Sequence, residues 1–165
     1  MKHRVDFALA LLVLVMCGRT PANAGVADFS QVGRGSLDIF DRCLGREGEI
    51  VEQRVIDCTT LIQNVAWQGY SSPRYARALA YEKLGKLDLA IADLEQATQL
   101  GGRHDQNRPH IYNNLCFVQA IAGGSLDKAL ADCNRSLELL PGYAYTLDSR
   151  AFVEFKMKNY AAVIA

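Results

Sequence analysis

The sequence predicts an all-α protein built from consecutive antiparallel pairs of helices. One observation is an internal repeat, because residues 87–100 match residues 126–139 after a shift of 39 positions, with six identities. A second is that the apolar residues of both segments recur at steps of three and four, which is the period of an amphipathic helix. A third is the placement of Gly85 and the pair Gly123-Gly124, which separate helical stretches at short intervals.

Residues 1–24 have the pattern of a secretory signal peptide. A short basic start is followed by an apolar run over 7–16, and Ala22 and Ala24 supply small residues two positions apart. We therefore expect cleavage after Ala24. The apolar run is too short to cross a bilayer, so no membrane span is expected after signal cleavage. Two alternatives are an uncleaved helix lying against the domain and a lipid attached to Cys17.

The mature chain is expected to begin with a flexible segment over 25–35, followed by a degenerate helical hairpin over 36–70. A stripe with spacing 4, 3, 4, 3 predicts the second helix of this hairpin. A shorter apolar pattern predicts the helix before it. The stripe consists of Val51, Val55, Cys58, Ile62 and Val65, and the shorter pattern of Leu37, Phe40 and Cys43.

Three further helix pairs are expected in the region 71–165, each with a first and a second helix. Ser72 is expected to cap the helix that Pro73 begins, and Ser125 to cap a later one. The third unit stops at Ala165, so its second helix is expected to be cut short. The expected helices cover 73–84, 87–100, 109–122, 126–139 and 144–157.

These units resemble the tetratricopeptide repeat (TPR), a pair of antiparallel helices with a period of 34 residues. The resemblance implies a TPR-like superhelix, an antiparallel helix-pair solenoid with about two and a half repeats after the degenerate hairpin. The matching residues are Ala78, Tyr81, Gly85, Ala90 and Ala97, then Asn114, Gly123, Ala129, Ser136 and Pro141, then Ala151, Tyr160 and Val163.

The stretch 57–62, Asp-Cys-Thr-Thr-Leu-Ile, resembles a sub-group of exported bacterial TPR proteins with a cysteine in each helix of the first hairpin. This resemblance and the signal peptide predict an exported protein of the bacterial periplasm. An even number of cysteines remains after cleavage, which fits disulfides in such a compartment. We expect Cys43 to pair with Cys58 and Cys116 with Cys133; the alternative is buried free thiols that act as small apolar side chains.

Charged residues recur at equivalent repeat positions. Arg77 and Arg150 share a place in two first helices, and Asp93 and Asp132 share one in two second helices. We expect Arg77 to pair with Asp93 across its hairpin as a structural ion pair. The alternative is an arginine that binds an anion. Arg150 lacks the equivalent carboxylate and is expected to be unpaired or to find another partner.

The TPR resemblance implies a concave groove, lined by first helices, that holds an extended peptide or a partner helix. The positions of the family's dicarboxylate clamp hold mostly Tyr, Asn and Asp148 instead of basic residues, so capture of an acidic C-terminus is not expected. For Phe117 and Phe152, the alternative role is ordinary packing between repeats. The candidate groove residues are Tyr75, Leu79, Asn113, Asn114, Phe117, Ser149, Phe152 and Lys156.

No catalytic motif, phosphate loop or metal-binding spacing occurs in the sequence, so no enzyme, cofactor or metal is expected. The 18 basic and 18 acidic residues argue against a nucleic-acid partner. We therefore predict a protein–protein interaction module, an adaptor or scaffold whose partner is another protein or peptide. The alternative is a non-catalytic accessory or small-ligand-binding domain of an exported enzyme system. A homodimer through the truncated C-terminal end is a further candidate.

Overall fold

The computed structural model describes residues 34–45, 50–102 and 105–158. These residues belong to one compact unit that spans 32–165. The predicted signal peptide, the segment 25–33 and the truncated last helix lie outside the described residues. The hairpin predicted to begin at residue 36 begins in the structure with a helix that already includes Arg34 and Gly35.

The described residues form seven α-helices and one short 3₁₀ helix, with no strand among them. The fold is therefore all-α, as the sequence predicts. The elements are α1 Arg34–Leu44, α2 Val51–Gln63, η2 Val65–Trp67, α3 Ser72–Lys83, α4 Leu87–Thr98, α5 Arg108–Ile121, α6 Leu126–Leu139 and α7 Ala144–Lys156.

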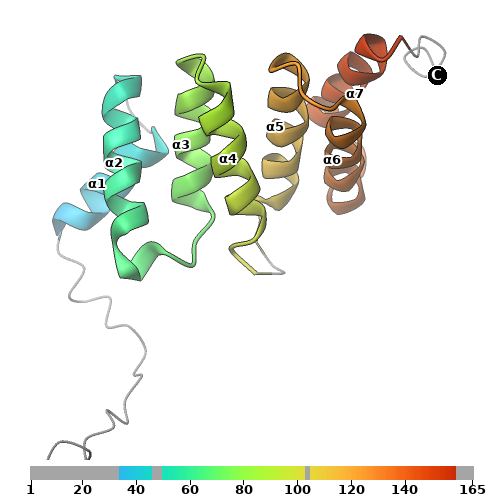
Figure 1. Cartoon of the computed structure of the whole chain (residues 1–165). Coiled ribbons are helices and arrows are strands. Elements are labelled where there is room, and N and C mark those ends of the chain that lie inside the picture. The colour runs from blue at the N-terminus through green and yellow to red at the C-terminus, as the bar shows by residue number, and fades with distance from the viewer. Residues whose placement is uncertain (1–33, 46–49, 103–104, 159–165) are drawn as a thin grey trace, which may run out of the picture. The chain divides into compact units, whose positions relative to one another are not determined.

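The helices pack in chain order as antiparallel pairs, α1 with α2, α3 with α4 and α5 with α6, and α7 packs on both α5 and α6 (Figure 1). Each pair also packs on the next, which is the arrangement of a helix-pair solenoid. The apolar stripes of the helices are buried in three successive clusters, and α3 and α5 each contribute to two of them. One lies around the Cys43 and Cys58 side chains, the next around Leu94 and Ile111, and the last around Cys116 and Val153.

Glycines end the first helices of the two complete repeats. Gly85 has φ +68° and Gly123 has φ +76°, a conformation that costs other residues energy. The N–H groups of Lys86 and Gly124 donate back to the carbonyls of Tyr81 and Gln119, which closes each helix end. The glycine breaks in the sequence therefore mark the turns inside the helix pairs.

One predicted cap is correct and one is wrong. Ser125 caps α6, because its hydroxyl accepts the N–H of Lys128. Ser72 does not cap α3, since it is the first residue of that helix. The capping position belongs to Ser71, whose hydroxyl instead donates to the carboxylate of Asp105 in the loop after α4. The long loop is thus tied to the start of α3.

The sequence predicts that Val65 continues the apolar stripe of α2, and this prediction is wrong. The helix ends at Gln63, and the side chain of Asn64 accepts the N–H of Ala66 and begins the 3₁₀ turn. Val65 is 81% exposed in that turn. Its place in the core is taken by Trp67, whose ring stacks on Phe40 of α1 with centroids 4.6 Å apart.

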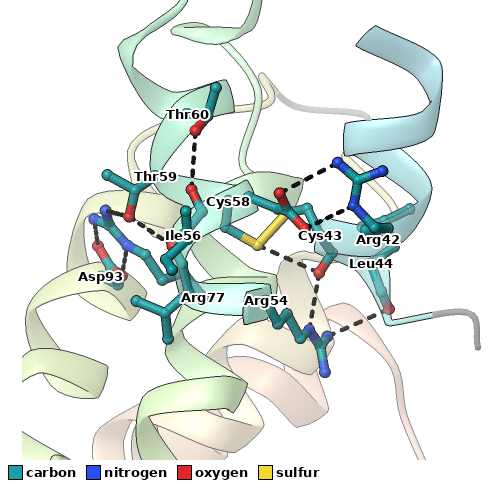
Figure 2. The surroundings of a disulfide bond; sticks show 12 residues. Arg42, Cys43, Leu44, Arg54, Ile56, Cys58, Thr59, Thr60, Arg77 and Asp93 are labelled. Carbon is teal, nitrogen blue, oxygen red and sulfur yellow. Dashed lines mark hydrogen bonds and ion pairs between the residues drawn. A yellow bond between two sulfur atoms is a disulfide. The ribbon is translucent and has the colours of Figure 1, made fainter. Parts of the chain in front are cut away.

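Two disulfides link helices within pairs. Cys43 of α1 bonds to Cys58 of α2, with Cα atoms 4.8 Å apart (Figure 2). Cys116 of α5 bonds to Cys133 of α6, with Cα atoms 5.3 Å apart. All four side chains are buried, so neither bond is open to solvent. Among the residues that the structure describes, no helix combines the length and the apolar character needed to span a membrane.

Candidate functional site

The first helices α3, α5 and α7 share a groove of about 390 Å³. The spacing of the lining residues places them on one face of each helix, because residues three and four apart are neighbours on a helix surface. The groove is lined by Glu82 from α3, by Asn113, Asn114 and Phe117 from α5, and by Tyr145, Asp148, Ser149 and Phe152 from α7.

Five of the eight residues predicted from the sequence line this groove: Asn113, Asn114, Phe117, Ser149 and Phe152. Tyr75 and Leu79 line a second hollow of about 340 Å³, where α3 meets the N-terminal hairpin. Lys156 lines neither of the two, because its ammonium group donates to the carbonyl of Ala120 at the end of α5, at 2.5 Å.

Three lining residues were not among the eight candidates: Glu82, Tyr145 and Asp148, of which Asp148 was expected only at a clamp position. Their spacing carried the signal. Glu82 follows Tyr75 by seven positions, and Tyr145 precedes Ser149 by four, so each lies on the same helix face as a predicted residue. Continuing each stripe by one helical turn finds all three.

Two hydrogen-bond donors of the groove, on Asn114 and Ser149, are already used inside the protein. The amide nitrogen of Asn114 donates to the Tyr75 hydroxyl at 2.8 Å and to the His110 carbonyl at 3.1 Å. The hydroxyl of Ser149 donates to the carbonyl of Tyr145 at 2.9 Å. Burial raises the pKa of Tyr75 to about 12, so its hydroxyl stays neutral at physiological pH.

Asn113 has an amide oxygen that is buried and makes no hydrogen bond. The residue is 8% exposed and belongs to the groove lining. Buried polar atoms without a partner are uncommon in folded proteins, since each loses its hydration without replacement. This oxygen is therefore an unused acceptor on a residue that lines the groove.

The charges that line the groove are negative. Glu82 is half-buried, and this burial raises the pKa of its carboxyl while the nearby Lys83 ammonium acts in the opposite direction. Asp148 is exposed and lines the same groove. Its lining contains no lysine or arginine. The groove is therefore suited to ligands without negative charge.

Two aromatic rings form the apolar part of the groove. The centroids of Phe117 and Phe152 are 6.0 Å apart, with the ring planes tilted by 47°. Phe152 also packs against the core cluster around Cys116. The phenylalanines thus serve both the packing between α5 and α7 and the groove surface.

The predicted ion pair joins α3 to α4. Arg77 Nε donates to Asp93 Oδ2 and Arg77 Nη2 to Asp93 Oδ1, each at 2.7 Å (Figure 2). A third nitrogen of Arg77 donates to the Thr59 hydroxyl on α2 at 2.9 Å, which ties the repeat to the N-terminal hairpin. This guanidinium is fully engaged in structural contacts. Arg150 has a different partner, Glu154, at 3.7 Å.

The charged side chain of the second hollow is already engaged within the protein. Arg54 is the charged residue of its lining, and its side chain donates to the carbonyls of Cys43 and Leu44, where it closes the end of α1 (Figure 2). Within the described part of the chain, no group of three or more His, Cys, Asp or Glu side chains is arranged to hold a metal ion.

The structure is similar to the NMR structure of the second TPR domain of the human RPAP3 protein in complex with HSP70 peptide SGPTIEEVD. The TM-score is 0.61 with 24% identity, and the match covers 72% of this chain and 94% of that chain. The described unit therefore has the TPR fold, which confirms the fold predicted from the repeat pattern. No family model matches the sequence, and no curated protein matches it.

Proposed function

We propose that this protein is a protein–protein interaction module that holds a peptide segment or partner helix in the groove between α3, α5 and α7. The observation that carries the proposal is the buried, unpartnered oxygen of Asn113 beside the rings of Phe117 and Phe152. A peptide brings a backbone N–H at every residue and alternating side chains, so one ligand satisfies both features.

The size of the groove and its exposed aromatic area suit the binding of a short peptide segment. Its volume of about 390 Å³ is that of a few side chains, which fits an anchor residue and its neighbours. Tyr145, at 69% exposure, stands at the groove with apolar area that is free to be covered. Aromatic residues of this kind supply large contact area at low cost in conformational entropy.

The proposed module is an exported one, and the compartment is the bacterial periplasm. The signal-like N-terminus over 1–24 and the two disulfides support this assignment, because disulfides persist in oxidising compartments. The proposed role is non-catalytic. The four cysteines in the described residues are bonded in pairs, so none of them is a thiolate nucleophile.

A peptide-display selection on the mature protein tests the proposal. Random nonapeptides are selected, and the recovered peptides are measured by fluorescence polarisation against wild type and against Asn113→Ala and Tyr145→Ala. We expect at least about a fivefold loss of affinity in both variants. Tyr70→Ala is the matched control, because Tyr70 is also exposed but lines neither of the two hollows. Peptides that bind all four proteins equally would contradict a groove-based module.

A small-ligand-binding domain of an exported enzyme system is the second candidate. The groove volume lies within the range of small-molecule sites, which is the observation that favours it. A thermal-shift screen of small polar metabolites separates the two. A stabilising metabolite whose effect is lost in Asn113→Ala, together with no selected peptide, would replace the peptide proposal by this one.

A further inference from the structure

We propose, on the basis of the peptide-binding function above, that the groove selects a cationic side chain, lysine or arginine, in an extended peptide. Glu82 and Asp148 supply two carboxylates to one lining, from α3 and α7. Between these helices, α5 contributes the buried Asn113 oxygen and the ring of Phe117. The ligand that this combination fits has a positive charge, several N–H donors and an apolar stem.

The two carboxylates of the lining decide the sign of the ligand. The amide nitrogen of Asn114 and the hydroxyl of Ser149 already donate to protein acceptors. The acceptors of the lining are the carboxylates of Glu82 and Asp148 and the amide oxygen of Asn113. The lining also holds two donors, the Asn113 amide nitrogen and the Tyr145 hydroxyl, but its only charges are the two carboxylates. A lysine has three N–H donors and an arginine five, and neither has an acceptor, so both are complementary to this surface.

The buried oxygen of Asn113 is evidence independent of the acidic residues. It is more than nine-tenths buried, lines the groove and has no hydrogen bond in the protein. An incoming N–H would therefore replace a lost hydration bond without displacing an internal partner. The amide oxygen of Asn113 would therefore fix the position of a bound N–H group. Surface carboxylates alone would attract cations without fixing their position.

The aromatic rings suit the remainder of a long basic side chain. The methylene stem of lysine or arginine packs on apolar surface, and its charged head interacts with ring faces. Phe152 already contacts one ammonium group, since Lys156 Nζ lies 5.5 Å from its ring centroid. Lys156 is held by the Ala120 carbonyl and does not line the groove, and Lys83 is the cation that acts on Glu82.

The same electrostatics exclude acidic peptides. The peptide in the similar RPAP3 structure, SGPTIEEVD, contains three carboxylate side chains. Placing such groups beside Glu82 and Asp148 brings like charges together in a partly desolvated site, which opposes binding. The two TPR grooves are therefore expected to differ in ligand charge although they share a fold.

The experiment extends the display selection to charge. Selected peptides are synthesised in three forms, with each lysine or arginine retained, replaced by norleucine, or replaced by glutamate. We expect about a tenfold loss of affinity with norleucine and no measurable binding with glutamate. We expect about a fivefold loss in Glu82→Gln and in Asp148→Asn, and weaker binding as the salt concentration rises.

Matched controls separate charge at the groove from charge elsewhere. Glu52→Gln and Asp127→Asn remove one carboxylate each from exposed first turns of α2 and α6, and both are expected to bind as wild type. Neither Glu82→Gln nor Asp148→Asn removes a hydrogen bond that the structure shows to another side chain, and circular dichroism checks that both variants are folded.

Three outcomes are distinguishable. Enrichment of lysine or arginine, together with sensitivity to Glu82→Gln and Asp148→Asn, supports the proposal. Peptides that need Asn113 and Tyr145 but are neutral or acidic, and ignore the carboxylate variants, overturn the cationic selection and leave the interaction module intact. Peptides that bind regardless of every groove variant, or no selected peptide at all, overturn both.

Discussion

Replacing Asp132 by asparagine is expected to stabilise the protein at neutral pH, whereas the same change at Asp93 is expected to destabilise it. The two carboxylates occupy equivalent positions, 39 residues apart, in α4 and α6. Asp93 is paired with Arg77 through two hydrogen bonds. The residue equivalent to Arg77 in the next repeat is Cys116, so Asp132 lacks this partner, and its Oδ2 atom is buried without a hydrogen bond.

The pKa of Asp132 sets the size of the effect. Burial raises this pKa to about 6, while Lys128 and Gln119 act in the opposite direction. The folded state therefore binds a proton more readily than the unfolded state, whose carboxyl titrates near 4. Above both pKa values, ionisation opposes folding by at most about 3 kcal/mol. Asp132 is only partly buried, so solvent screening reduces this to about 1 kcal/mol.

The sign of the pH dependence follows from the same values. Because the folded-state pKa is the higher one, the penalty is complete above pH about 6, falls to about half near pH 5 and disappears below pH about 4. The stabilisation in Asp132→Asn should shrink in parallel as the pH is lowered. For Asp93→Asn we expect a loss of about 2–3 kcal/mol at pH 7.5, since Arg77 would lose its carboxylate partner while keeping Thr59.

Urea denaturation followed by circular dichroism at 222 nm measures both variants at pH 7.5 and pH 5. The two substitutions make the same chemical change at equivalent repeat positions, so each is the control of the other. A destabilised Asp132→Asn variant, or a gain that is the same at both pH values, would refute the argument that α6 holds a partly buried carboxylate without an arginine partner.

Three further effects on stability follow from the described contacts. Replacing both Cys116 and Cys133 by alanine should lower the free energy of unfolding in urea by about 3 kcal/mol, the chain-entropy value for a loop of this length, and an unchanged midpoint under oxidising conditions would contradict the bond. Ser136→Ala should cost about 1–3 kcal/mol, because the buried hydroxyl bonds both the Pro109 carbonyl and Thr146; thermal unfolding measures it. Ser125→Ala should cost about 1 kcal/mol through loss of the α6 cap, with Ser125→Asp retaining stability as the control.

The repeat pattern was sufficient to predict the order and nature of the helices from α3 to α7. Helical periodicity and glycine breaks are local signals, and the structure places the turns at Gly85 and Gly123. Prediction failed where a tertiary contact decided the local structure. The hydroxyl of Ser71 is taken by Asp105 from a distant loop, and Trp67 replaces Val65 in the core by stacking on Phe40.

The groove residues were predicted in part for a related reason. Resemblance to the TPR pattern identifies the face of each first helix, and α5 contributes the three residues predicted for it. The limits of the groove depend on which turns of neighbouring helices face each other. That geometry brings Glu82 of α3 and Tyr145 of α7 into the lining and leaves Lys156 bonded to the Ala120 carbonyl. The sequence pattern shows the face, and packing between repeats selects the turns.

Each complete helix pair is fastened by an ion pair, by a disulfide or by both. In the N-terminal hairpin, Arg42 pairs with Asp57 at 2.9 Å, immediately beside the disulfide of the neighbouring cysteines.

The first regular repeat relies on the ion pair of Arg77 and Asp93, without a disulfide between α3 and α4. In the second, Cys116 stands where Arg77 stands in the first. Its disulfide partner Cys133 directly follows Asp132, which has no arginine partner. The link between α5 and α6 is thus covalent where the link between α3 and α4 is ionic, and both hold a first helix of the groove in position. A disulfide is independent of pH and salt but needs an oxidising environment, so the rigidity of α5, which carries Asn113 and Phe117, depends on the compartment in which the protein folds.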